Sequence, residues 1–76
     1  MQSLREVRLR QFKTIRALAT AADVATKTIV DIEAGRTVPR QSTMLRIAAA
    51  LGVKPGEVAE FNAAVEDWIE EGKDAA

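Results

Sequence analysis

The sequence of 76 residues contains no cysteine, no histidine and no tyrosine. Without cysteine, neither a disulfide framework nor a thiolate metal cage can form. Most nucleophile and acid–base arrangements also need one of these three residue types, so we expect no catalytic site, no metal site and no cofactor. Long apolar runs are lacking too, since no stretch approaches the roughly 18 residues of a membrane span. The sequence therefore predicts a cytoplasmic protein that is neither an enzyme nor a membrane protein.

Neither sign of charge is in excess, because 11 lysines and arginines balance 11 aspartates and glutamates. A neutral total argues against nucleic acid, which favours basic partners. The charges are unevenly placed, however. Residues 1–46 carry nine cationic and four acidic side chains, whereas residues 47–76 carry two cationic and seven acidic ones. Such an asymmetry indicates that the first part of the chain contacts nucleic acid.

Capping residues, glycines and prolines divide the chain into about five short helices, which predicts a single all-α domain. The expected helices begin near Leu4 after a Ser3 cap, at Ile15 after a Thr14 cap, and at Thr26, Gln41 and Pro55. Their expected ends lie near Asp23, Ala34, Leu51 and Glu71, with a joint at Phe61-Asn62. The apolar spacing places Leu4, Val7, Phe12, Leu18, Ala22, Ile29, Ile32, Met44, Leu45, Ile47, Ala48 and Leu51 in the core. Two short helices joined by a tight turn form a helix-turn-helix, although a bundle without special function gives the same pattern.

A more specific pattern of spaced residues runs through residues 4–60. Its members are Ile15 to Ala19, Val24, Thr28-Ile29, Ile32 to Gly35, Pro39 and Thr43 to Val53. In these positions the chain resembles the Xre/Cro family of DNA-binding helix-turn-helix domains, whose members include phage-type repressors. The resemblance implies a five-helix, lambda-repressor-like fold whose third helix lies in the major groove.

The resemblance also implies which residues contact DNA. The base-reading positions of the family correspond to Thr26, Lys27, Thr28 and Asp31. Its phosphate-binding positions correspond to Arg8, Thr14, Arg36, Thr37 and Arg40, and also to Ile15 and Ala34. Lysine can donate to guanine, and a carboxylate can accept from the cytosine amino group. An intrahelical pair between Lys27 and Asp31 is the alternative role for the carboxylate.

Four residues depart from the family pattern, and a fifth has an implied structural role. Ile15 and Ala34 replace polar side chains that often bind the DNA backbone. Ala25 cannot cap the third helix, and losing such a cap lowers stability by about 1 kcal/mol. Asp23 replaces the usual turn glycine, but aspartate tolerates a left-handed backbone, so we expect the turn to form. At Glu33 the resemblance implies a structural bond toward the preceding helices, with Arg8, Arg10 or Arg16 as its partner.

Beyond Pro55 the apolar residues form one helical stripe, and the opposite face is acidic. The stripe consists of Val58, Phe61, Val65, Trp68 and Ile69. Because the domain needs only the first two to close its core, we divide the chain into a DNA-binding domain, residues 1–60, and an extension, residues 61–76. The extension predicts a dimer contact through Phe61, Val65, Trp68 and Ile69, with folding back onto the domain as the alternative.

The sequence thus favours a transcriptional regulator that binds double-stranded DNA as a homodimer on a palindromic operator. The alternative is a protein-interaction module on the same fold, such as an antitoxin-like or anti-repressor subunit. In that case the acidic C-terminal helix would hold a protein partner. The two hypotheses differ in salt dependence, because each neutralised phosphate contributes a slope of roughly −0.9 to log affinity against log salt.

Overall fold

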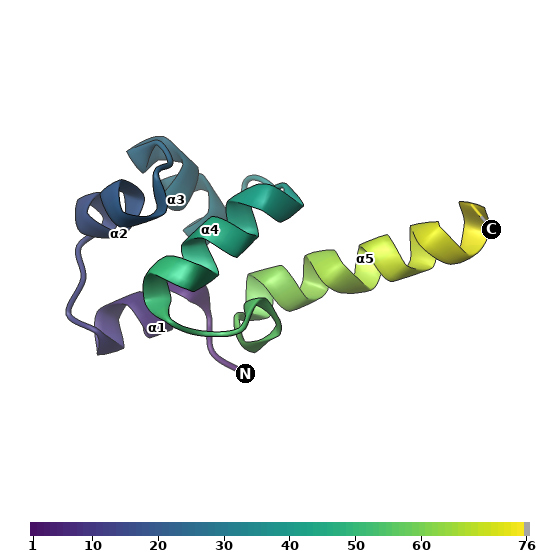
Figure 1. The fold of residues 1–76 in the computed structure, drawn as a ribbon, viewed down its shortest axis with the longest axis horizontal. Coiled ribbons are helices and arrows are strands. Elements are labelled where there is room, and N and C mark those ends of the chain that lie inside the picture. The colour runs from purple at the N-terminus through teal and green to yellow at the C-terminus, as the bar shows by residue number, and fades with distance from the viewer. Residues whose placement is uncertain (76) are drawn as a thin grey trace.

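The computed structural model describes the backbone of residues 1–75 and the side chains of residues 1–70. The helices are α1 (Leu4–Arg10), α2 (Ile15–Ala22), α3 (Thr26–Glu33), α4 (Gln41–Leu51) and α5 (Ala59–Ala75), with a 3-10 helix, η1 (Pro55–Glu57), before the last. The predicted all-α class with five helices is confirmed. Figure 1 shows α1 to α4 grouped together, with α5 extending away from them toward the C-terminus. In the part of the chain that is described, no helix is long and apolar enough to cross a membrane.

Hydroxyl side chains begin the first two helices, as predicted. Ser3 Oγ accepts the Glu6 amide at 3.1 Å, and Thr14 Oγ1 accepts the Ala17 amide at 3.0 Å. The third helix follows Ala25, and its N-terminus has no side-chain cap. The predicted absence of this cap is confirmed, so α3 depends on tertiary packing more than α1 and α2 do.

A left-handed residue makes the turn between α2 and α3. Asp23 has φ 57° and ψ 48°. The amides of Asp23 and Val24 donate to the carbonyls of Thr20 and Ala19 at 3.2 and 3.0 Å. Aspartate enters the left-handed region more readily than most residues, so the turn forms without glycine, as predicted.

One apolar core joins all five helices. Its fully buried side chains are Leu4, Leu18, Ile29, Ile32, Met44, Ile47, Val58 and Phe61. The prediction was wrong for Phe12 and Leu45, whose exposed fractions are 95% and 52%. Phe12 follows the end of α1 with φ 57°, and its side chain is left in solvent. Leu45 is exposed because α4 turns Met44 and Ile47 inward, which leaves the position after Met44 off the buried face.

The last helix begins at Ala59, later than the predicted Pro55. Pro55 opens η1 instead, and Val58 is extended at φ −98° and ψ 124°. Val58 forms a parallel bridge with Gln2, and the Ala59 amide donates to the Gln2 carbonyl at 2.8 Å. This pairing holds the chain extended just before α5, which is why the helix cannot start at the proline.

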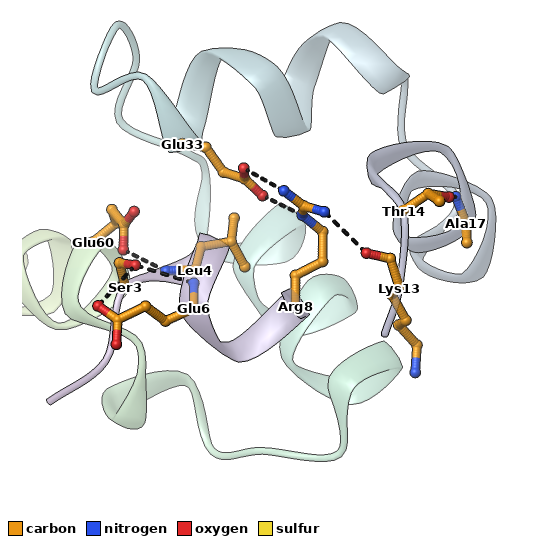
Figure 2. Close-up of polar contacts among 9 residues, drawn as sticks. All are labelled: Ser3, Leu4, Glu6, Arg8, Lys13, Thr14, Ala17, Glu33 and Glu60. Carbon is orange, nitrogen blue, oxygen red and sulfur yellow. Dashed lines mark hydrogen bonds and ion pairs between the residues drawn. The ribbon is translucent and has the colours of Figure 1, made fainter. Parts of the chain in front are cut away.

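The body of α5 is continuous from Ala59 to Ala75, so the predicted joint at Phe61-Asn62 is absent. The helix also passes the predicted end at Glu71, because one glycine lowers helix stability by only about 1 kcal/mol. Near its start, Glu60 Oε1 accepts the Leu4 amide at 2.9 Å (Figure 2). The amide of Leu4 has no acceptor within α1, and this carboxylate supplies one. The hydrogen bond attaches the first turn of α5 to α1.

Candidate nucleic-acid interface

The two sides of α3 have opposite surroundings. Ile29 and Ile32 are buried in the core, at 0% and 1% exposure. On the other side, Thr26 and Lys27 are exposed, and Val30 is 37% exposed. The inward residues fix the helix on the body, which leaves its outward side chains free to contact a partner.

The connection from α3 to α4 lies beside this outward side. A hollow between them is lined by Thr28, Asp31, Thr37, Val38, Pro39, Arg40 and Thr43. It brings two predicted base-reading residues, Thr28 and Asp31, together with two predicted phosphate-binding residues, Thr37 and Arg40. The sequence analysis did not identify Thr43. This residue lies in the first turn of α4, and it comes close to α3 only when the chain folds.

A buried ion pair fastens the inner side of α3 to α1. Arg8 Nε and Nη2 donate to the two carboxylate oxygens of Glu33 at 2.8 and 3.0 Å, and Nη1 donates to the Lys13 carbonyl at 2.9 Å (Figure 2). The two side chains are only 8% and 9% exposed. The hydrogen bond to Glu33 raises the pKa of Arg8 further above its ordinary value. The structural role implied for Glu33 is confirmed, and its partner is Arg8.

This placement corrects the expectation that Arg8 binds phosphate. Three guanidinium nitrogens already donate to protein oxygens, and the side chain lies between α1 and α3. A phosphate that approached the exposed surface would meet Lys27, Arg36 or Arg40 first, because these side chains are in solvent. Arg8 therefore stabilises the fold instead of forming part of the outer surface.

The other predicted phosphate-binding residues are at the surface. Arg36, Thr37 and Arg40 are exposed in the connection between α3 and α4. Thr14 is exposed at the N-terminus of α2, where its hydroxyl accepts the Ala17 amide. The remaining first-turn amides of a helix have no intrahelical acceptor, and such an end attracts anions.

An ion cluster occupies the outward side of α3. Lys27 Nζ lies 2.6 Å from Asp31 Oδ2, and Arg36 Nη1 lies 3.6 Å from Asp31 Oδ1. The hydrogen bond from Lys27, with a smaller contribution from Arg36, lowers the pKa of Asp31 below its ordinary value. The intrahelical pair that the sequence offered as an alternative for Asp31 is thus present in the free protein.

A comparison with protein families decides the class of this fold. The profile of the helix-turn-helix domain family matches residues 2–61. The chain belongs to the helix-turn-helix domain family. No curated protein and no solved structure matches it significantly. Helix-turn-helix domains bind DNA through the second helix of the motif, which in this domain is α3.

Beyond the matched residues, this helix-turn-helix domain carries an apolar surface on α5. Val65 and Trp68 are half-buried and line a groove with Met44, Leu45 and Pro55. Ile69 is 50% exposed, whereas Phe61 is fully buried in the core of the single chain. The four residues predicted for dimerisation therefore differ in exposure. Of these four, Val65, Trp68 and Ile69 have surface that another molecule could cover, and Phe61 does not.

Proposed function

We propose that this helix-turn-helix domain is a sequence-specific regulator of transcription of the Xre/Cro type, with α3 in the major groove of double-stranded DNA. The proposal depends on which residues lie on the outward side of α3. This side presents Thr26, Lys27 and Thr28 on the first turn of the helix, where groove-docked helices usually contact base edges. Each of these side chains can donate a hydrogen bond to an acceptor in the major groove.

Phosphate contacts would flank α3 on both sides in this arrangement. Arg36, Thr37 and Arg40 follow the helix, and Arg40 is an exposed cation suited to a phosphate oxygen. The N-terminus of α2, beside Thr14, would hold a phosphate of the neighbouring stretch of backbone. Such contacts fix the position of the domain on the duplex, while the side chains of α3 read the bases.

We further propose that two copies bind a palindromic operator, joined through the extension. Leu45 and Ile69 are half-exposed apolar side chains. Leu45 lines the groove together with Val65 and Trp68, and Ile69 directly follows Trp68 on α5. A second copy that covers this groove removes apolar area from water twice, because a two-fold interface uses the same patch on both partners. Since Phe61 and Ala64 are buried within one chain, the dimer surface begins after them.

Selection of bound sequences from random duplex DNA tests this function directly. A palindromic consensus whose half-sites lie about one helical turn apart is the expected result. Binding to that consensus should weaken as salt rises, with a slope of roughly −0.9 per neutralised phosphate. Failure to enrich any duplex would contradict the proposed function.

The dimer is tested separately by the mass of the protein in solution. Replacing Ile69 by Ser places a hydroxyl in the proposed interface and leaves the core untouched, so we expect the mass to shift from dimer to monomer. Glu66→Ala is the matched control, because Glu66 is exposed on the acidic face of the same helix. If both variants keep the mass of the wild type, the extension does not hold the two copies together.

One observation favours a second candidate, a protein-interaction module. The exposed residues of α5 include Glu66, Asp67 and Glu70, which form an acidic surface on a helix that extends away from α1 to α4 (Figure 1). A basic protein partner would suit that surface. The same selection experiment separates the two candidates, because an interaction module enriches no duplex.

A further inference from the structure

Lys27 and Asp31 lie one turn apart on α3 and form a donor–acceptor pair at the protein surface. Their 2.6 Å contact uses Asp31 Oδ2, while Oδ1 faces Arg36 from the following connection. Lys27 remains 83% exposed, and Asp31 is 18% exposed. The ammonium group thus keeps two of its three N–H donors for a ligand, and the carboxylate keeps lone pairs that its protein partners do not use.

A carboxylate on this side of α3 is unfavourable for general DNA binding, because it approaches a chain of phosphates. Two neighbouring cations offset that repulsion in the free protein. The combination is therefore better suited to selecting a base pair than to raising affinity for any duplex. A paired cation and carboxylate present donors and an acceptor side by side, which is a pattern that a base pair can match.

The major-groove edge of a G·C pair has the complementary pattern. Guanine presents two acceptors, N7 and O6, and the cytosine N4 amino group beside them is a donor. Lysine can donate to both guanine atoms while it keeps its bond to Asp31. The carboxylate can then accept from the cytosine amino group, so every charged group stays paired when the base pair is bound.

We propose that Lys27 and Asp31 read one G·C base pair as a unit, with Lys27 on guanine and Asp31 on cytosine, and that Arg36 is a positioning residue that holds Asp31. This inference rests on the proposed function, since it assumes that α3 enters the major groove. It assigns a specific base pair to Lys27 and Asp31, and it explains how the ion pair of the free protein takes part in recognition.

The other base pairs match less well. An A·T pair read in the same direction keeps the N7 acceptor for Lys27. It replaces guanine O6 by the adenine amino donor, however, and it puts the thymine O4 acceptor opposite the carboxylate of Asp31, so it is disfavoured. The reversed pair, T·A, offers Lys27 only one acceptor, because a methyl group replaces guanine N7 as its second neighbour. The preference for G·C over T·A therefore depends on the second lysine hydrogen bond.

Three variants test the unit: Lys27→Ala, Asp31→Ala and the double variant. Selection of bound duplexes with the wild type first identifies the half-site, and affinities are then measured for every base pair at each position. We expect a G·C preference of roughly 5- to 150-fold at one position. Each single variant should lose that preference at the same position, and the double variant should lose no more than a single one.

Two further variants complete the test, one as a control and one for the positioning role of Arg36. Glu66→Ala changes the net charge as Asp31→Ala does, but on α5, and should leave the base preference unaltered. Arg36→Ala should reduce the G·C preference less than Asp31→Ala while the same position remains the one affected. Circular dichroism of each variant checks that it folds.

The outcomes separate this inference from the function on which it rests. If the wild type enriches no duplex, the proposed function fails. If it enriches a duplex but the two single variants alter different positions, or their effects multiply in the double variant, the paired reading is overturned and the proposed function stands. A consensus without an essential G·C pair in the half-site would overturn it as well.

Discussion

Asp31 and Glu33 are two residues apart on α3, and both carboxylates have an arginine as a partner, yet their surroundings are opposite. Glu33 bonds to Arg8 inside the protein, where both side chains are less than one-tenth exposed. Asp31 bonds to Lys27 and faces Arg36 on the outside, where the lysine is 83% exposed. Positions two apart on a helix point to nearly opposite sides, so one short helix carries both arrangements.

The comparison shows that burial gives two similar ion pairs different roles. When one partner of a buried ion pair is removed, the other charge stays buried without compensation, and the fold loses stability. An exposed pair contributes little to stability, since water screens it and its side chains stay mobile. The inner pair of α3 is therefore a structural attachment to α1, and the outer cluster is available for recognition.

Removing one charge from the inner pair should have the largest effect. We expect Glu33→Gln to lower the free energy of unfolding by about 3 kcal/mol, because it leaves the buried guanidinium of Arg8 without its counter-charge. Urea unfolding followed by circular dichroism measures the change, with Asp31→Asn as the matched control on the outer side.

A small domain can unfold outright on such a loss, so a double variant keeps the prediction testable. Arg8→Met combined with Glu33→Leu removes both charges and should retain more stability than Glu33→Gln. Equal destabilisation by Glu33→Gln and Asp31→Asn would show that burial does not distinguish the two carboxylates.

The outer side should show the reverse behaviour, a loss in DNA discrimination without a loss of stability. We expect Lys27→Ala to reduce discrimination between the selected operator and a mismatched one by roughly 1–3 kcal/mol. The free energy of unfolding should change by no more than about 0.5 kcal/mol. Equilibrium titrations at fixed salt measure the first quantity, with Arg16→Ala, an exposed cation on α2, as control. Uniform weakening on all duplexes would mean that Lys27 contacts phosphate instead of a base.

A third variant tests the segment that follows α1, next to the buried pair of Arg8 and Glu33. Arg8 also bonds to the Lys13 carbonyl, directly after Phe12, whose φ of 57° strains a bulky residue. Because Phe12 is 95% exposed, Phe12→Gly loses no packing and should raise the free energy of unfolding by about 0.5–1 kcal/mol. Thermal unfolding measures this gain. Phe12→Ala is the control, since it removes the ring but keeps the strain, and an equal gain there would exclude backbone strain as the cause.

The smallest effect concerns the titration of the outer cluster. Lys27 and Arg36 favour the ionised form of Asp31 in the folded state, so its pKa lies below the ordinary value of about 3.9. Any stability that the carboxylate contributes is therefore complete above that ordinary value and is lost as the pH falls through the lowered one. NMR titration of the carboxyl carbon should give a lower midpoint in the wild type than in Lys27→Ala. Arg36→Ala should cause a smaller rise, and identical midpoints in all three proteins would rule out this coupling.

Local features of the fold were predictable from the sequence, because their causes lie within a few residues. Ser3 and Thr14 begin their helices by bonding to amides three positions ahead. Asp23 makes the turn through its own tolerance of a left-handed backbone. Such interactions need no knowledge of the distant chain.

Other features were misjudged because their causes lie far along the chain. The extended Val58 pairs with Gln2, and this pairing delays the start of α5. Arg8 could be assigned to phosphate or to Glu33 from the sequence alone, and only the packing of α1 on α3 decides between them. At the candidate interface, the exposed side of α3 followed from helical spacing, whereas the neighbourhood of Thr43 did not.

The sequence by itself determined that the chain is helical, where most helices begin, and that its cationic and acidic residues are separated along its length. It did so because capping, periodicity and composition are local properties. The tertiary structure decided which charges are buried and which remain in solvent. That choice depends on contacts between residues such as Arg8 and Glu33, far apart in the chain, whose burial is fixed only when the helices pack.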